Sequence, residues 1–250
     1  MVGRLKSNPS AVGVASGRCV GSFMRGLPFG GAIIADLRPL PRLWQSAVMT
    51  IYFHEEDLPE GALAAGPVAV DTETMGLQPG RDRLCLVQIS DGGEDEHLVR
   101  FAPGSDYVAP NLKAVLADPA RIKLYHFARF DLASIQAYLG IMAAPVFCTK
   151  IASRLIRTYT DRHGLKDIAL ELLDVEMDKA ARHTDWSSPD LRPEQVRYAI
   201  SDVTFLLRLK DRLDDMLDRE GRRALAEECF KVIPTMAALD LLGYEALFEH

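Results

Sequence analysis

Apolar and polar positions change their spacing along the chain, and these changes predict its elements. After residue 66, continuous apolar runs at 68–72 and 84–90 have the length and composition of buried strands. Glycine and proline between 76 and 80 predict a turn that joins the two strands as a hairpin. The segment 91–93 predicts a second turn, which leads to a third strand near 97–101.

Beyond the third strand, apolar residues take helical spacing between short strand-like runs. Strands are predicted at 122–127 and 146–148, and helices at 109–116 and 130–139. Three sequential strands followed by strands that alternate with helices predict an α/β fold with a mixed sheet flanked by helices. The remainder is predicted as four helices, at about 149–158, 164–173, 193–218 and 220–240.

The first 48 residues follow neither pattern and are rich in Gly, Ser, Pro and Arg. Such a composition fits a disordered arm, an Arg-rich and acid-poor transit-like peptide, or a stretch upstream of the true start. We favour the last of these, because the composition changes abruptly at Met49 and a strand-like alternation follows at 51–54. The expected organisation is a disordered or non-native extension over 1–48 and one domain over 49–250.

Charge and cysteine content narrow the classes of function. Residues 1–48 carry a net charge of +5 and the rest −11, so the acidic body is not built to coat long nucleic acid through bulk charge. No apolar run reaches the roughly 18 residues needed to cross a bilayer, so no membrane partner is expected. The four cysteines are scattered without a C-x-x-C pair, which argues against a thiolate zinc site and fits a reducing cytoplasm.

The most informative polar residues are Asp71 and Glu73, at the end of the first buried strand. Side chains on a strand alternate between its faces, so both carboxylates project to one side, about 6–7 Å apart along the chain. Two carboxylates at a buried strand end are costly unless a positive charge lies between them, and hard cations such as Mg²⁺ take carboxylate oxygens. Because acids that close a strand are usually just solvated, the pair decides nothing until the rest of the chain supplies more ligands.

Three further residues complete a set. Asp131 lies near the start of the helix at 130–139, where capping and the helix dipole alone would explain an acid. Tyr198 and Asp202 are four residues apart in a predicted helix, so they point to one face. Asp202 lies beside the apolar stripe of that helix, where an unpaired acid is less readily explained as a solvated surface residue.

The order of these residues resembles the three motifs of the DEDDy family of 3′→5′ exonucleases, a group that includes ribonuclease D. The resemblance implies the ribonuclease H-like fold, an α/β fold with a mixed sheet flanked by helices. All four acids and the tyrosine occur in the family's order. The motifs read V-D-T-E-T at 70–74, H-F-A-R-F-D at 126–131 and Y-A-I-S-D at 198–202.

Other segments look like the compact NrnC-type oligoribonucleases, or nano-RNases, of bacteria. Ribonuclease D carries helical domains after its catalytic domain, whereas only about 40 residues follow the helix of Asp202 here, too few for another domain of ordinary size. The match runs from about Met49 to the C-terminus. Members of this family form octameric rings, so the resemblance implies a homo-oligomer. The matching segments lie at 71–79, 81–85, 147–153, 157–166 and 239–244.

The resemblance also implies hydrolysis of a phosphodiester with two metal ions. Asp71, Glu73, Asp131 and Asp202 would hold two divalent cations, Mg²⁺ or Mn²⁺, with Asp71 between them. Tyr198, whose phenol has an unperturbed pKa of about 10, is a poor base and would orient the attacking water and relay its proton. A histidine takes this place in the sister group, so Tyr198 assigns the chain to the tyrosine branch.

Contacts with the substrate are implied for a second group of residues. The backbone amides of Thr74 and Met75 would meet the 3′-terminal sugar, and Leu77 would wedge against the terminal bases. His126 would approach a phosphate, with a structural role as the alternative. The basic cluster after Met49 is either a solvated helix face or, in part, a lining of the substrate path, and we favour the second. Some of its members could instead serve a subunit contact. Its members are Lys150, Arg154, Arg157, Arg162, His163 and Lys166.

The function expected from the resemblance is metal-dependent 3′→5′ exoribonuclease activity on short RNAs, especially dinucleotides. A ribonuclease D-like enzyme or a DNA exonuclease acting on longer substrates, such as tRNA ends or DNA, is the rival within enzymes. A nucleic-acid-binding module that lost catalysis ranks lower, because every expected metal ligand is present.

Overall fold

The computed structural model describes residues 32–33, 49–177, 184–188 and 190–248. The expectation for the extension over 1–48 therefore lies outside the described residues, except for the two-residue strand β1 (Ala32–Ile33). That strand pairs antiparallel with β2 (Thr50–Glu55), the strand expected just after Met49.

Three consecutive strands form the centre of the sheet. β3 (Val68–Thr74), β4 (Leu84–Ser90) and β5 (Asp95–Arg100) pair antiparallel in the spatial order β3-β4-β5. The predicted hairpin between the first two is confirmed. All residues of β4 are buried, which agrees with its continuous apolar run at the middle of the sheet.

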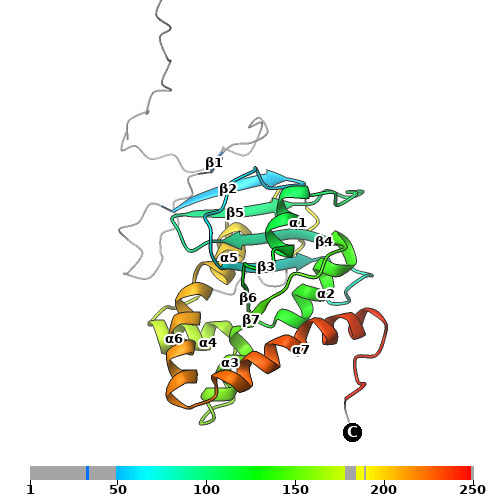
Figure 1. Cartoon of the computed structure of the whole chain (residues 1–250). Helices are drawn as coiled ribbons and strands as arrows, with labels where there is room; N and C mark the ends of the chain where they lie inside the picture. The colour runs from blue at the N-terminus through cyan, green and yellow to red at the C-terminus, as the bar shows by residue number, and fades with distance from the viewer. Residues whose placement is uncertain (1–31, 34–48, 178–183, 189, 249–250) are drawn as a thin grey trace, which may run out of the picture.

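Parallel strands extend the sheet on both sides, as Figure 1 shows. β2 runs parallel to β5, and β6 (Lys123–Tyr125) and β7 (Val146–Cys148) run parallel beyond β3. The described strands make one seven-stranded sheet in the order β1-β2-β5-β4-β3-β6-β7. The sheet is mixed and flanked by helices, so the predicted fold class is confirmed.

The two faces of the sheet pack against different helices. Val87 and Ile89 of β4 belong to the main core, together with residues of α1 (Pro110–Ala117) and α2 (Ala128–Leu139). Leu86, which directly precedes Val87, packs in a second cluster with residues of α5 (Pro193–Thr204). The alternation of side chains along β4 thus separates α2 from α5, and these two helices approach β3 from opposite faces.

Four further helices lie beyond the β6–β7 edge of the sheet (Figure 1). They are α3 (Thr149–Ile156), α4 (Leu165–Leu173), α6 (Leu206–Arg219) and α7 (Arg223–Leu241). Helix α7 packs against α2, α3 and β7, and α6 packs against α3 and α4. Across the described part of the chain, no helix is long and apolar enough to span a membrane.

The single helix predicted over 193–218 is wrong, because the structure breaks it at Phe205 into α5 and α6. The hydroxyl of Thr204 donates a hydrogen bond to the carbonyl of Ile200 at 2.7 Å. Threonine bonding to the carbonyl four residues back bends helices. The break lets α5 cover the sheet while α6 joins the helices beyond its edge.

Candidate active site

A cleft of about 620 Å³ opens where β3 ends and α2 begins, with α5 on its far wall. It contains every acid of the predicted set, together with the predicted tyrosine. Its lining residues are Asp71, Thr72, Glu73, Thr74, Met75, Gly76, Leu77, His126, Phe127, Phe130, Asp131, Lys150, Gly164, Leu165, Thr184, Trp186, Tyr198 and Asp202.

Three of the acids form a tight group. One carboxylate oxygen from each of Asp71, Glu73 and Asp202 lies within 4.8 Å of the other two. The alternation along β3 brings Asp71 and Glu73 to one face, and α5 brings Asp202, which lies 129 residues after Glu73, to the same face. Such a set of oxygen ligands suits a hard divalent cation.

Asp131 joins the cleft from the other side of β3. It lies in the first turn of α2, is buried, and accepts a hydrogen bond of 2.7 Å from the hydroxyl of Thr72. Burial raises the pKa of Asp131 to about 7, and the charge of Asp202 adds to the increase, while the bond from Thr72 opposes it. Asp131 lies outside the tight group of three acids, but it is close enough for the charge of Asp202 to raise its pKa.

Mutual repulsion makes this site suited to cations. Burial raises the pKa of Asp71 well above its usual range, and the charges of Asp131, Asp202 and Glu73 raise it further. A divalent cation would remove this penalty, because it neutralises the carboxylates that repel one another. The chemistry of the donor set therefore fits the divalent cations expected from the sequence.

Tyr198 stands above the acids on α5. Burial raises the pKa of its phenol, and the nearby Asp202, Glu73 and Asp71 raise it further, so the hydroxyl keeps its proton. The ring of Trp186 lies tilted against that of Tyr198, with the centroids 6.1 Å apart, and the indole is buried. Tyr198 is thereby held as a neutral hydroxyl at the edge of the carboxylate group.

Two supporting residues escaped the sequence analysis. Thr72 lies between the two acids of D-x-E and therefore faces the opposite side of β3, where it binds Asp131. Gln88 is opposite Asp71 in the β3–β4 ladder, is fully buried, and its Nε2 donates to Asp71 Oδ2 at 3.4 Å. The register of the predicted hairpin was the signal that could have identified Gln88.

The predicted substrate contacts around the turn after β3 lie in the cleft. Leu77 and Met75 are 87% and 58% exposed, and Thr74 donates a short hydrogen bond to the carbonyl of Gly76. The expectation for the Met75 amide needs correction, because this N–H donates to the carbonyl of Arg83 at 3.0 Å. Met75 therefore offers its side chain, rather than its amide, to the cleft.

His126 also lines the cleft, and its hydrogen bond with Thr149 indicates its tautomer. Its Nδ1 lies 2.9 Å from the hydroxyl of Thr149, which donates to the carbonyl of Tyr125 at 3.2 Å. Because the hydroxyl has one proton, it accepts from His126, and Nδ1 carries the hydrogen.

The members of the basic cluster lie in different environments in the structure. Of its members, Lys150 alone lines the cleft. Arg157 is buried and forms an ion pair with Glu171, so it is not among the members of the cluster that line the cleft. Arg154 and Lys166 are exposed and lie outside the lining of the cleft.

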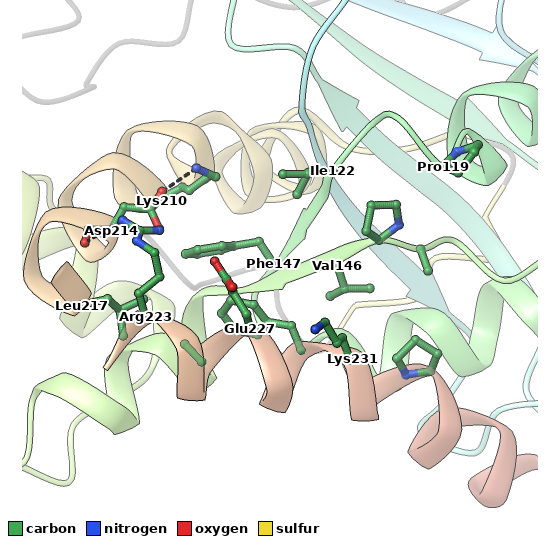
Figure 2. A pocket seen from close by; sticks show the side chains of 15 residues that line it. Pro119, Ile122, Val146, Phe147, Lys210, Asp214, Leu217, Arg223, Glu227 and Lys231 are labelled. Atoms are coloured by element: carbon green, nitrogen blue, oxygen red, sulfur yellow. Dashed lines mark hydrogen bonds and ion pairs between the residues drawn. The ribbon is translucent and has the colours of Figure 1, made fainter. Parts of the chain in front are cut away.

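Figure 2 shows a second hollow of about 620 Å³, between the β6–β7 edge and helices α6 and α7. Its lining is largely apolar, with Val146 and Phe147 at its floor. Lys210 and Arg223 at its rim both pair with Asp214. None of the predicted site residues lines this hollow.

The fold and the site together define a nuclease of the carboxylate-cluster type: a mixed sheet in which an inner strand, β3, carries D-x-E, with further acids from two flanking helices. Comparison with known families agrees. A family model described as 3′-5′ exonuclease matches residues 47–218, and the chain belongs to this family.

Individual relatives support the narrower resemblance. The structure of Brucella melitensis NrnC bound to pGG is 50% identical, with a TM-score of 0.77 over 81% of this chain and 99% of that one. The structure of the same protein with bound Mg²⁺ is 49% identical, with a TM-score of 0.76 over 81% of this chain and all of that one (100%). The ribonuclease D of Gluconacetobacter diazotrophicus is 37% identical over 157 residues, which is 62% of this chain and 39% of that protein.

These comparisons confirm the resemblance to ribonuclease D and to NrnC-type proteins. The chain spans about two fifths of the length of the curated ribonuclease D relatives that it matches. The predicted domain bounds, 49–250, begin close to the family match and extend beyond its end at residue 218.

Proposed function

We propose that this chain degrades short oligoribonucleotides from their 3′ ends to nucleoside 5′-monophosphates, with divalent cations as cofactors and dinucleotides as preferred substrates. The observation that carries this proposal is the group formed by Asp71, Glu73 and Asp202 in a cleft that also holds Asp131 and Tyr198. The same five residues are the acids and the tyrosine of the sequence motifs.

Each residue has a distinct role in the proposed reaction. Two bound cations, Mg²⁺ or Mn²⁺, would supply charge stabilisation for the attacking and leaving oxygens of the phosphodiester. Asp71, Glu73, Asp131 and Asp202 provide the carboxylate oxygens that hold them. Because the raised pKa of Tyr198 keeps it neutral, its hydroxyl orients the attacking water by hydrogen bonding rather than removing a proton as an anion.

A preference for short substrates rests on the relationship with NrnC, whose structure was determined with pGG. The turn after β3 offers Thr74, Met75 and Leu77 to the 3′-terminal nucleotide, and His126 approaches a phosphate. Arg154 and Lys166 attract the anionic substrate from outside the cleft.

The proposal also covers the oligomeric state of the protein and its location in the cell. By resemblance to the NrnC family, we expect a homo-octamer that works in the cytoplasm. Sedimentation velocity of the purified chain tests the assembly, and a mass near that of the 27.7 kDa monomer would contradict it.

One assay tests the proposed activity. RNAs of two, three, five and seven nucleotides carrying a 5′ label are incubated with the protein and Mg²⁺ or Mn²⁺, and the initial rates are compared. The Asp71→Asn variant is the matched control for contaminating nuclease. We expect the highest rate on the dinucleotide, and rates that stay level or rise with length would contradict the preference.

The relatives named ribonuclease D favour a second candidate, an exonuclease of longer substrates such as tRNA ends. The same length series distinguishes the two, and DNA oligonucleotides added to it test a DNA exonuclease. Binding of RNA without any cleavage would instead indicate a non-catalytic module.

A further inference from the structure

Phe127 has a backbone conformation that is unusual for a bulky residue. It is the N-cap of α2, with φ 80° and ψ 45° in the left-handed region, and its side chain makes no capping hydrogen bond. Glycine and asparagine adopt this region readily, whereas a large side chain is strained there. Strained residues of this kind cluster at binding and catalytic sites.

This strained position presents an aromatic ring to the cleft. Phe127 is 50% exposed, and it lines the cleft beside Asp131 and His126. The ring is therefore neither packed into the core nor explained by capping of the helix. An exposed aromatic ring within an otherwise acidic cleft indicates a surface for an apolar, planar group.

Lys150 adds a positive charge at the same place. It is the second residue of α3, and its Nζ lies 4.2 Å from the centroid of the Phe127 ring, which is a cation–π distance. Among the described residues that line the cleft, Lys150 is the only lysine or arginine. An aromatic ring beside a cation suits an unpaired nucleotide, since the base stacks and the phosphate meets the charge.

We propose that Phe127 and Lys150 form a nucleotide platform, in which the Phe127 ring stacks on one base of the substrate and the Lys150 ammonium group contacts an adjacent phosphate. The platform rests on the proposed exoribonuclease function. It adds a binding surface on the α2–α3 side of the cleft, separate from the turn after β3 that contains Leu77. Stacking on a phenyl ring accepts any base, so the platform selects unpaired ends rather than a sequence.

Steady-state kinetics of the full-length protein on a 5′-phosphorylated diribonucleotide test the platform. Phe127→Leu should raise KM about five-fold or more, with kcat within about two-fold, because stacking contributes to binding of the base. Phe127→Trp, which keeps an aromatic face, should hold KM at or below the wild-type value. Lys150→Gln should raise KM and weaken its dependence on salt. Phe248→Leu, which changes an exposed phenylalanine outside the cleft, is the matched control and should change neither constant.

Substrates that lack one base distinguish stacking from a purely structural role of Phe127, because a structural role would affect intact and abasic substrates equally. Wild-type protein should bind one of the two abasic dinucleotides more weakly, and Phe127→Leu should cause no further loss with that substrate. Equal KM values for wild type and Phe127→Leu on intact RNA would overturn the platform, as would an equal loss on intact and abasic substrates. If Phe127→Leu does not fold, a raised KM in the folded Phe127→Trp variant would overturn it. Absence of cleavage by the wild type would instead refute the proposed function.

Discussion

Replacement of Glu96 by Gln should flatten the dependence of stability on pH. Glu96 lies on β5 opposite Ser90, is 1% exposed, and its Oε2 is buried without a hydrogen-bond partner. Burial raises the pKa of Glu96 to about 8, and Asp91 and Asp95 add to the increase, while hydrogen bonding with Ser90 and Thr204 opposes it. Near neutral pH the carboxyl group is therefore largely protonated in the folded protein.

The size of the effect follows from the two pKa values of Glu96. Its ordinary value is 4.5 and its value in the folded protein is about 8. Between them the folded state binds one proton more than the unfolded state, so the stability present below pH 4.5 is lost as pH rises to 8. The slope is about 1.4 kcal/mol per pH unit, or roughly 3 kcal/mol between pH 5.5 and 7.5. Gln has the shape of the protonated carboxyl group and does not titrate, so this loss should be absent in Glu96→Gln.

Urea denaturation at pH 5.5, 6.5 and 7.5 in the presence of EDTA measures the difference. Asp71 and Asp131 also have raised pKa values, but they contribute equally to both proteins and cancel in the comparison. Glu94→Gln removes an exposed acid two residues from Glu96 and should leave the wild-type slope intact. Parallel curves of unfolding free energy for wild type and Glu96→Gln would refute the reasoning.

Four other changes have defined outcomes. Tyr198→Phe should keep Mg²⁺ binding by calorimetry but lose about 100-fold or more in kcat, and a near-normal rate would exclude its role. Asp71→Asn should raise the melting temperature of the metal-free protein, since it removes a repelled buried charge, and should abolish stabilisation by Mg²⁺ in a thermal shift assay. Arg129→Ala breaks a partly buried two-pronged ion pair with Asp240 and should cost about 1–2 kcal/mol by urea denaturation, with little further loss on adding Asp240→Asn. Trp186→Ala should cost about 3 kcal/mol or more in the same assay, and an unchanged midpoint would place its indole outside the folded core.

Local periodicity accounts for the parts of the fold that the sequence predicted. The D-x-E acids share a face because β3 alternates, and Tyr198 and Asp202 share one because α5 turns every 3.6 residues. The break at Phe205 was missed because the apolar pattern continues through it. The hydroxyl of Thr204 bonds to the carbonyl of Ile200 just before the break, which favours a bend and is not encoded in the periodicity.

The roles of the basic side chains could not be assigned from the sequence, for a different reason. A carboxylate at a buried strand end is costly unless it is solvated or paired, so several such acids occurring in one ordered set indicate a cation. A basic residue is solvated at little cost, and its role depends on which distant residue it meets. Arg157 is buried against Glu171 of α4, whereas Lys150, seven residues earlier, lies on the Phe127 ring in the cleft. Phe127 was placed at the end of the strand predicted over 122–127, whereas it is the left-handed N-cap of α2 and is half exposed. Acid positions are thus predictable from local spacing, while the environment of each basic residue is set by contacts with residues distant in sequence, as between Lys150 and Phe127 and between Arg157 and Glu171.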